Sequence, residues 1–257
     1  MSVYYQDDLV TLHHGDCLEV LPSISGVDLV VTSPPYNLGI CPNGSLGNYT
    51  TGQKRGGQRK WRGVNEKGIE YAEHNDAMPA PDYVEWQQQV LASLWNCLSE
   101  TGAIFYNHKP RVQAGPVWLP LELNPGLPIR QIVTWARAGG MNFNPTSYMP
   151  TYEWIIIFAK EKWRLRSRSA SGVGDVWRIP QEMANPHPAP FPLGIPARAI
   201  ETTAPTLVLD PFSGSGTTLR AAANAGVKAI GIEKSEQYCE IAARRLDQMA
   251  LDFGEGA

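Results

Sequence analysis

The feature that most constrains the fold is an apolar run that ends in a glycine-rich turn and continues as a helix. Residues 207–222 read LVLDPFSGSGTTLRAA. Gly214 and Gly216 let a ligand approach the backbone, and the start of the following helix favours an anionic group. The spacing is GxG, so the chain has neither the GxGxxG dinucleotide fingerprint nor a GxxxxGK[ST] phosphate loop here.

A carboxylate follows this turn at the end of the next apolar run. KAIGIEK, at 228–234, places Glu233 17 residues after Gly216. In a doubly wound sheet, an acid at the tip of the neighbouring strand binds the two hydroxyls of a ribose. The turn and the acid together therefore predict a site for a nucleoside-containing cofactor.

The rest of the chain alternates between strand and helix patterns, which predicts an α/β fold with a mainly parallel sheet. Apolar runs predict seven strands, at 9–13, 27–31, 103–108, 129–137, 152–160, 206–212 and 228–234. Helical spacing predicts helices at 16–24, 81–102, 194–204, 216–226 and 235–251, the second of them stopping at Gly102. Residues 38–80 carry no apolar period and are interpreted as an inserted, mobile basic loop in a single domain, 1–257.

The run at 27–31 ends in Ser33, Pro34, Pro35 and Tyr36. Proline has no N–H but keeps its carbonyl, so this strand end presents acceptors in a rigid array, and Tyr36 adds a ring on which a planar base can stack. Such an array suits an –NH2 group on a nucleobase, whose lone pair is otherwise delocalised into the ring. Taken alone, the stretch also reads as a Pro-Pro turn that closes a strand.

Together, Ser33–Tyr36 and DPFSGSGTT at 210–218 resemble two motifs of the DNA amino-methyltransferases. These enzymes transfer methyl from S-adenosylmethionine to N4 of cytosine or N6 of adenine. HGDCLEVL, YEWIIIFAK and HPAPFPLGIPARAI are also similar to segments of that family. The resemblance covers nearly the whole chain except 38–80, and the order of the motifs resembles the circularly permuted β group. It implies a Rossmann-like methyltransferase fold, a mostly parallel seven-stranded sheet with helices on both faces.

The resemblance also implies roles for particular residues. Ser33, Pro34, Pro35 and Tyr36 would form the catalytic site that holds a flipped base. Glu233 would bind the ribose, and Asp16 the cofactor's adenine amino group, although Asp16 also suits the N-cap of a helix. The remaining residues implied to bind S-adenosylmethionine are Cys17, Asp210, Phe212, Ser213, Gly214, Ser215, Gly216 and Thr217.

The target base is less constrained than the reaction. SPP[Y/F] is associated in the family mainly with N4-cytosine, and [D/N]PP[Y/F] mainly with N6-adenine, so Ser33 favours cytosine and leaves adenine as the alternative. Two more distant alternatives are a methyltransferase that acts on RNA or a protein amide, and a non-catalytic DNA-binding module.

Binding of DNA must be local, because the net charge is −3, with 22 Lys and Arg against 25 Asp and Glu. Two basic stretches are the candidates, although such stretches are often only solvated loops. They comprise Lys54, Arg55, Arg59, Lys60, Trp61 and Arg62 in the first, and Arg164, Arg166 and Arg168 in the second. Double-stranded DNA is the expected partner, and a homodimer or a cognate restriction endonuclease remain open as further partners.

The four cysteines, at 17, 41, 97 and 239, form no CxxC pair, so no metal site or disulfide framework is expected. No run approaches the roughly 18 apolar residues that span a bilayer, and the N-terminus does not resemble a signal peptide. A cytoplasmic protein with reduced thiols is therefore expected.

Overall fold

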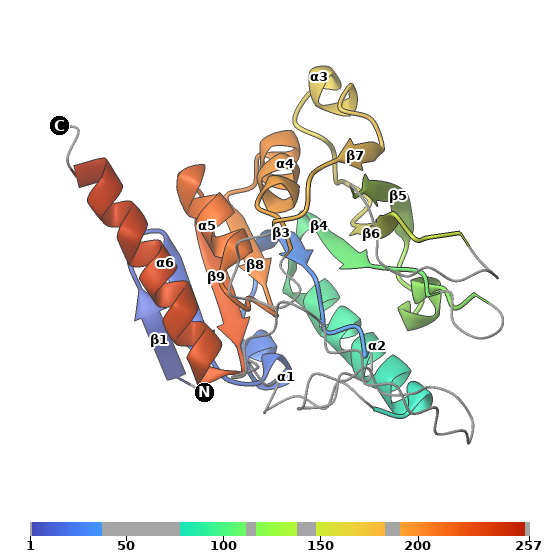
Figure 1. The fold of residues 1–257 in the computed structure, drawn as a ribbon, viewed down its shortest axis with the longest axis horizontal. Coiled ribbons are helices and arrows are strands. Elements are labelled where there is room, and N and C mark those ends of the chain that lie inside the picture. Colours follow the sequence, from blue (N-terminus) through green and yellow to red (C-terminus); the bar gives the residue numbers. More distant parts are fainter. Residues whose placement is uncertain (1, 38–77, 112–116, 138–147, 183–190, 255–257) are drawn as a thin grey trace.

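All the strands that the computed structural model describes belong to one sheet (Figure 1). The structure describes residues 2–37, 78–111, 117–137, 148–182 and 191–254. The strands are β1 (Ser2–Gln6), β2 (Val10–His14), β3 (Val27–Thr32), β4 (Leu98–His108), β5 (Ile129–Ala136), β6 (Tyr152–Ala159), β7 (Val176–Arg178), β8 (Leu207–Asp210) and β9 (Lys228–Glu233). The α-helices are α1 (Cys17–Val20), α2 (Ala80–Cys97), α3 (Arg168–Ser171), α4 (Gly194–Thr203), α5 (Thr217–Asn224) and α6 (Glu236–Gly254), with short 3-10 turns at Leu21–Ser23 and Pro120–Leu123.

The centre of the sheet is parallel, as the alternation of strands and helices predicts. The spatial order is β1-β2-β9-β8-β3-β4-β6-β5-β7. Strands β2, β9, β8, β3 and β4 run in parallel, β6 is antiparallel to β4 and to β5, and β1 is antiparallel to β2. Strands β3 and β8 are neighbours, so the ends of the two motif-bearing strands lie side by side at the carboxyl edge of the parallel strands.

Helices cover both faces of the sheet, as expected. On one face α4, α5 and α6 pack through residues such as Ile200, Leu219 and Leu246. On the other, α1 and α2 pack through residues such as Leu91 and Leu94. The central strands are buried on both sides, and this is why their sequences are continuous apolar runs.

The described sheet has nine strands, so the expected number, seven, is too low. The two additional strands, β1 and β7, lie at the two edges. Edge strand β1 is exposed or half-buried at every position, and β7 has three residues. Neither therefore produces the apolar period by which a strand is recognised in a sequence.

The end predicted for the second helix at Gly102 is wrong, because α2 ends at Cys97 and β4 begins at Leu98. Gly102 instead lies inside β4. A Cβ at this position would lie 2.7 Å from the carbonyl oxygen of Val27. The glycine therefore permits a close approach between β3 and β4 and does not cap a helix.

Candidate active site

The ends of β3 and β8 are joined by a buried hydrogen bond. The Thr32 hydroxyl donates to Asp210 Oδ1 at 2.8 Å, and the Phe212 N–H donates to the same oxygen at 3.1 Å. Both Thr32 and Asp210 are buried, and burial raises the pKa of Asp210 to about 6. The predicted catalytic stretch and the predicted cofactor loop thus begin at adjacent, directly bonded residues.

A cluster of polar side chains surrounds Ser33 and Tyr36. The Ser33 hydroxyl lies 3.0 Å from Tyr36 Oη, and the Tyr36 hydroxyl donates to Glu153 Oε2 at 2.9 Å. Asn107 Nδ2 donates to Glu153 Oε2 at 2.9 Å and also contacts Ser33 Oγ and Tyr36 Oη. Arg137 Nη1 pairs with the other carboxylate oxygen, Glu153 Oε1, at 3.1 Å.

The prolines are held from the opposite side by α2. Tyr83, buried on α2, donates its hydroxyl to the Pro35 carbonyl at 2.9 Å and also lies 2.9 Å from His108 Nε2. Pro35 therefore already has a donor, although the sequence suggested the carbonyls of the whole array as free acceptors. Among the described residues no hydrogen bond reaches the Pro34 carbonyl, which leaves it as the available acceptor.

The Tyr36 ring rests on the imidazole of His108. The two ring centroids are 4.3 Å apart at an interplanar angle of 31°. His108 is fully buried, and burial lowers its pKa to about 3. The neutral imidazole adds no charge of its own, and Lys109 Nζ lies 5.8 Å from the Tyr36 ring centroid.

Asn37, the residue after Tyr36, bridges two separate chain segments. Its backbone has a φ of 53°, which few residues other than glycine and asparagine adopt readily. Asn37 Nδ2 donates to the Met78 carbonyl at 2.9 Å, and Asn37 Oδ1 accepts from the Met78 N–H at 2.7 Å. Arg111 also donates to the Asn37 carbonyl, at 3.1 Å.

The glycine-rich turn has the backbone geometry that the sequence predicts. Gly214 and Gly216 have φ values of 50° and 78°, and Gly216 caps the start of α5. Arg245 on α6 donates to the carbonyl and the hydroxyl of Ser215, at 2.6 and 2.7 Å. The turn is thus fixed by its glycines and by a side chain from another helix.

The Glu233 carboxylate lies against this turn and retains acceptor capacity. Gly214 N–H donates to Oε2 and Ser235 N–H to Oε1, both at 2.8 Å. Burial raises the pKa of Glu233, while these two N–H groups oppose that shift. A carboxylate offers about four lone-pair positions, so two remain for hydroxyl groups such as those of a ribose. These free acceptor positions fit the ribose of a nucleoside cofactor.

Asp16 lies close to Glu233, at the end of the adjacent strand β2. Its Oδ1 accepts from the Leu18 N–H at 3.0 Å, which confirms it as the N-cap of α1. Its Oδ2 pairs with Lys234 at 3.1 Å. Cys17 is buried, and burial raises the pKa of its thiol to about 12, so within this site the thiol stays protonated.

The remaining predicted cofactor residues follow the same turn. Phe212 is half-buried and packs edge-on against Trp86 of α2, with centroids 5.7 Å apart. The other two are buried, Ser213 with its hydroxyl on the Asp210 carbonyl at 3.0 Å and Thr217 at the start of α5. These residues therefore lie together around the carboxyl ends of β8 and β9.

Of the two basic stretches, the structure describes only the second. Lys54, Arg55, Arg59, Lys60, Trp61 and Arg62 lie outside the described residues. Arg164, Arg166 and Arg168 are exposed.

The second stretch lies at the opposite end of the central strands from Ser33. It follows β6, where Lys160 N–H donates to the carbonyl of Gly102, near the start of β4, and Arg166 N–H donates to the carbonyl of Thr202, at the end of α4. Contact of these arginines with DNA stays a prediction that the structure does not link to Ser33.

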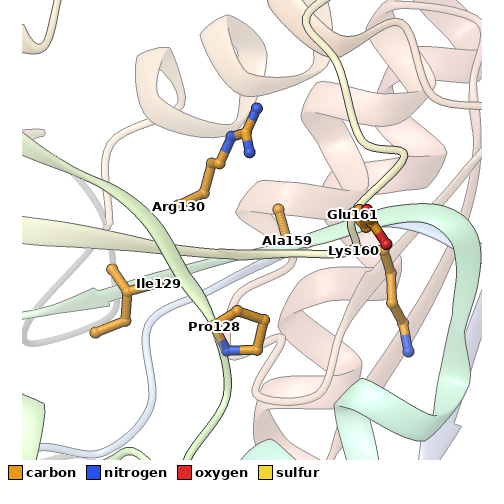
Figure 2. A pocket seen from close by; sticks show the side chains of 6 residues that line it. All are labelled: Pro128, Ile129, Arg130, Ala159, Lys160 and Glu161. Carbon is orange, nitrogen blue, oxygen red and sulfur yellow. The ribbon is translucent and has the colours of Figure 1, made fainter.

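A shallow hollow of about 250 Å³ lies near this same end of the strands (Figure 2). Its lining includes Ile129, Arg130 and Lys160, and none of the predicted site residues. Among the described residues, no group of three or more His, Cys, Asp or Glu side chains could hold a metal ion. Among the described residues, Cys17, Cys97 and Cys239 form no disulfide, and Cys41 lies outside the described residues. No helix in the described ranges has both the length and the apolarity to cross a bilayer.

Sequence analysis missed several polar residues that complete the Ser33 cluster. Asn107 and His108 end β4, and Glu153 is the one acid in the apolar strand β6. A buried acid or amide at a strand end is a signal that could have identified them. Tyr83 and Arg137 carry no such signal, because their roles depend on how α2 and β5 pack.

Comparisons with known proteins agree with this geometry. A family model described as DNA methylase matches residues 27–244. The type II methyltransferase M.ScaI of Streptomyces caespitosus is 28% identical over 290 residues, covering 96% of this chain and 84% of that protein.

Two solved structures share the fold. The PvuII DNA methyltransferase, described as cytosine-N4-specific, has a TM-score of 0.70 at 18% identity, covering 94% of this chain and 87% of that one. M1.HpyAVI, solved in complex with S-adenosylmethionine, has a TM-score of 0.59 at 19% identity, covering 92% and 100%. The family match contains both the Ser33–Tyr36 stretch and the Asp210–Thr217 turn, and the chain belongs to the DNA methylase family of S-adenosylmethionine-dependent N4 and N6 amino-methyltransferases.

Proposed function

We propose that this enzyme methylates the N4 amino group of a cytosine flipped out of double-stranded DNA at a specific sequence. The observation that carries the proposal is the position of Ser33. Its hydroxyl lies at the end of β3, inside a hydrogen-bonded cluster and next to the available carbonyl of Pro34. Two acceptors at one strand end match the two hydrogens of an amino group.

These acceptors activate a poor nucleophile. The lone pair of an exocyclic amino nitrogen is delocalised into the ring. Ser33 Oγ and the Pro34 carbonyl would accept its two N–H groups and favour tetrahedral geometry, which returns the lone pair to nitrogen. Such an effect stabilises the transition state more than the ground state. As the new N–C bond forms, the methyl C–S bond of the sulfonium would break with its electron pair staying on sulfur, and one N–H proton would pass from the nitrogen to solvent.

Tyr36 would supply the surface on which the flipped base stacks. One face of its ring is supported by His108, and its hydroxyl is anchored to Glu153. A ring held at both points offers a rigid platform, so stacking costs little conformational entropy.

The cofactor would lie along the carboxyl ends of β8 and β9. Glu233 would accept the ribose hydroxyls, the Phe212–Thr217 turn would contact the methionine part, and Asp16 would accept from the adenine amino group through its remaining lone pairs. Asp210 and Cys17 would contribute indirectly, because their buried contacts hold the turn and α1 in shape. When bound, S-adenosylmethionine supplies an electrophilic methyl group on a sulfonium.

Cytosine is proposed over adenine because Ser33 occupies the first motif position. Neither of the two solved structures decides the base, because at their identities they show the fold alone. The name of M.ScaI, a type II methyltransferase, supports a restriction-modification role with a cognate endonuclease. Whether the protein forms a homodimer is tested by measuring its molecular mass in solution.

The test is to express the chain in cells that lack other DNA methylation. One sample of their DNA is digested to nucleosides to identify the modified base, and a second, intact sample is sequenced to locate it. We expect N4-methylcytosine within one recurring sequence. N6-methyladenine instead would move the proposal to the other base. No modified base, from protein that binds S-adenosylmethionine, would overturn it.

Ser33→Ala tests the role of the motif. We expect methyl transfer to fall by roughly a hundredfold, in the range expected when one transition-state hydrogen bond is removed, with the Kd for S-adenosylmethionine unchanged. The matched control is Ser25→Ala, at an exposed serine before β3. An equal loss of cofactor binding in Ser33→Ala would contradict the assigned role.

A further inference from the structure

Among the described residues, Glu153 is the one carboxylate in the Ser33 cluster, and its position is unusual for a charged residue. It is 6% exposed and lies near the start of β6. All its contacts come from donors: Tyr36 and Asn107 at Oε2, and Arg137 at Oε1. A carboxylate can only accept in such contacts, so its presence determines the direction of every hydrogen bond made to it.

This direction passes through Tyr36 to Ser33. The Tyr36 hydroxyl has one proton, and that proton is used by Glu153. Tyr36 Oη can therefore only accept from Ser33, whose oxygen lies 3.0 Å away. The Ser33 proton then points at Tyr36, and the Ser33 lone pairs face away from it.

The ionisation state of Tyr36 agrees with this order. Burial, followed by the negative charge of Glu153, holds the pKa of Tyr36 well above its ordinary value. The phenol therefore keeps its proton throughout the neutral range, and the chain of hydrogen bonds keeps one direction.

The same carboxylate also orients the Asn107 amide. Because Glu153 Oε2 accepts, Asn107 must turn its nitrogen toward it. This leaves Asn107 Oδ1, which is buried and has no hydrogen-bond partner among the described atoms. Asn107 Nδ2 also donates to Ser33 Oγ at 3.3 Å, which uses one lone pair of Ser33 and leaves the other for the target base.

We propose that Glu153 is a positioning residue that sets the Ser33 hydroxyl as an acceptor for the amino group of the target base. The inference rests on the proposed function of Ser33. It adds a source of specificity, because an acceptor of fixed direction favours a base with –NH2 at the reacting position over a base with a carbonyl there. Cytosine and uracil differ in this group.

Glu153→Gln reverses the direction with almost no change of shape. Arg137 would hold the glutamine carbonyl at the Oε1 position, so the amide nitrogen would face Tyr36. The glutamine nitrogen would donate to Tyr36 Oη, and Asn107 would turn its oxygen toward that nitrogen. Tyr36 would then donate to Ser33, and the Ser33 proton would turn toward the base. The matched control is Glu161→Gln, at an exposed position just after β6.

The first measurement is a double-mutant cycle on single-turnover methyl transfer to the mapped DNA site. We expect Glu153→Gln to lower the rate by roughly tenfold to a hundredfold, as when one charge-assisted hydrogen bond is removed. If Glu153 acts through Tyr36, then adding Glu153→Gln to the Tyr36→Phe protein should change the rate by less than about threefold. Losses that multiply would overturn the proposal.

The second measurement is one that a purely structural role would not move. With S-adenosylhomocysteine present, the Kd is measured for two duplexes, one with cytosine and one with uracil at the target position. The cost of flipping each base cancels when the cytosine-to-uracil ratio of Kd is compared between proteins. We expect Glu153→Gln to shift this ratio toward uracil by roughly tenfold. An equal weakening of both duplexes would also overturn the proposal.

Tyr36→Phe serves if Glu153→Gln fails to fold, because it removes the same connection and should shift the same ratio. Failure of the proposed function is distinguishable: the wild-type protein would then make no N4-methylcytosine. If it makes N6-methyladenine, the same test applies with hypoxanthine in place of uracil.

Discussion

The Thr32 hydroxyl donates a 2.8 Å hydrogen bond to Asp210, so the last residue of β3 is bonded to the last residue of β8. These residues precede the Ser33–Tyr36 stretch and the glycine-rich turn. In the proposed arrangement, this contact would set the distance between the methyl acceptor and the methyl donor.

Thr32→Val should destabilise the fold by about 1–3 kcal/mol, because it leaves the buried Asp210 carboxylate with one donor fewer. Urea denaturation checks the free energy of unfolding. Thr101→Val, at an exposed position of β4, is the matched control and should change it by less than about 0.5 kcal/mol. A Thr32→Val protein as stable as the control would show that the bond contributes nothing net.

Asp210 should make stability depend on pH in a defined direction. Its pKa is about 6 in the folded protein against an ordinary 3.8, so between these values the folded state binds the proton more tightly. The stabilisation is complete below about pH 4 and is lost as the pH rises through about 6.

Asp210→Asn removes this titration. The unfolding free energy of the wild type, minus that of the variant, should fall by on the order of 3 kcal/mol from pH 4 to pH 7. Urea denaturation at several pH values gives the difference and cancels other groups, including His108, whose lowered pKa acts in the opposite sense. A difference that is flat with pH would contradict the assignment.

Glu233→Gln should weaken S-adenosylmethionine binding by roughly tenfold. An amide at this position must turn its –NH2 toward the N–H of either Gly214 or Ser235, so one acceptor disappears where both carboxylate oxygens now accept. Isothermal titration calorimetry measures the Kd. Glu236→Gln, at an exposed position in the first turn of α6, is the control and should bind normally.

Gly216→Ala should destabilise the turn for two separable reasons. A residue with a side chain at a φ of 78° costs about 1 kcal/mol or more, and its Cβ would lie 3.0 Å from the Cβ of Ala242. Gly226→Ala has the strained φ of 67° with nothing within 4 Å, so it measures the backbone part alone. Adding Ala242→Gly to Gly216→Ala should raise the Tm measured by thermal denaturation, by the part of the loss that comes from the contact with Ala242.

Neutralising the first basic stretch should weaken DNA binding and reduce its dependence on salt. The variant replaces the five cations, Lys54, Arg55, Arg59, Lys60 and Arg62, with glutamine. Each phosphate that is no longer neutralised by a cation should reduce the steepness of log K against log salt by about 0.9. Fluorescence anisotropy over a salt series gives this slope.

The second basic stretch provides the comparison. Glutamine at Arg164, Arg166 and Arg168 removes three cations from the opposite end of the central strands. We expect a much smaller change of slope from this variant. An equal change of slope per charge in the two variants would show that DNA reaches both ends.

The residues that sequence alone could identify are those whose chemistry is local. The Ser33–Tyr36 stretch and the glycine-rich turn each contain their own evidence in a few consecutive letters. Glu233 could be predicted because a parallel sheet places consecutive strand ends side by side.

Glu153 and Asn107 carry a local signal, a polar residue in an apolar strand, but their contacts with the Ser33 stretch could not be predicted from it. Their roles depend on β4 pairing with β6, where Asn107 lies opposite Ile155, and on Arg137 arriving from β5. Antiparallel additions to a parallel sheet follow no rule that fixes their order from the sequence. Strand β7 could not be predicted for a simpler reason, since three residues carry no period.

The two hydrogen bonds between Asn37 and Met78 join the described residues on either side of 38–77. The backbone that follows Tyr36 is thereby held against the backbone that precedes α2.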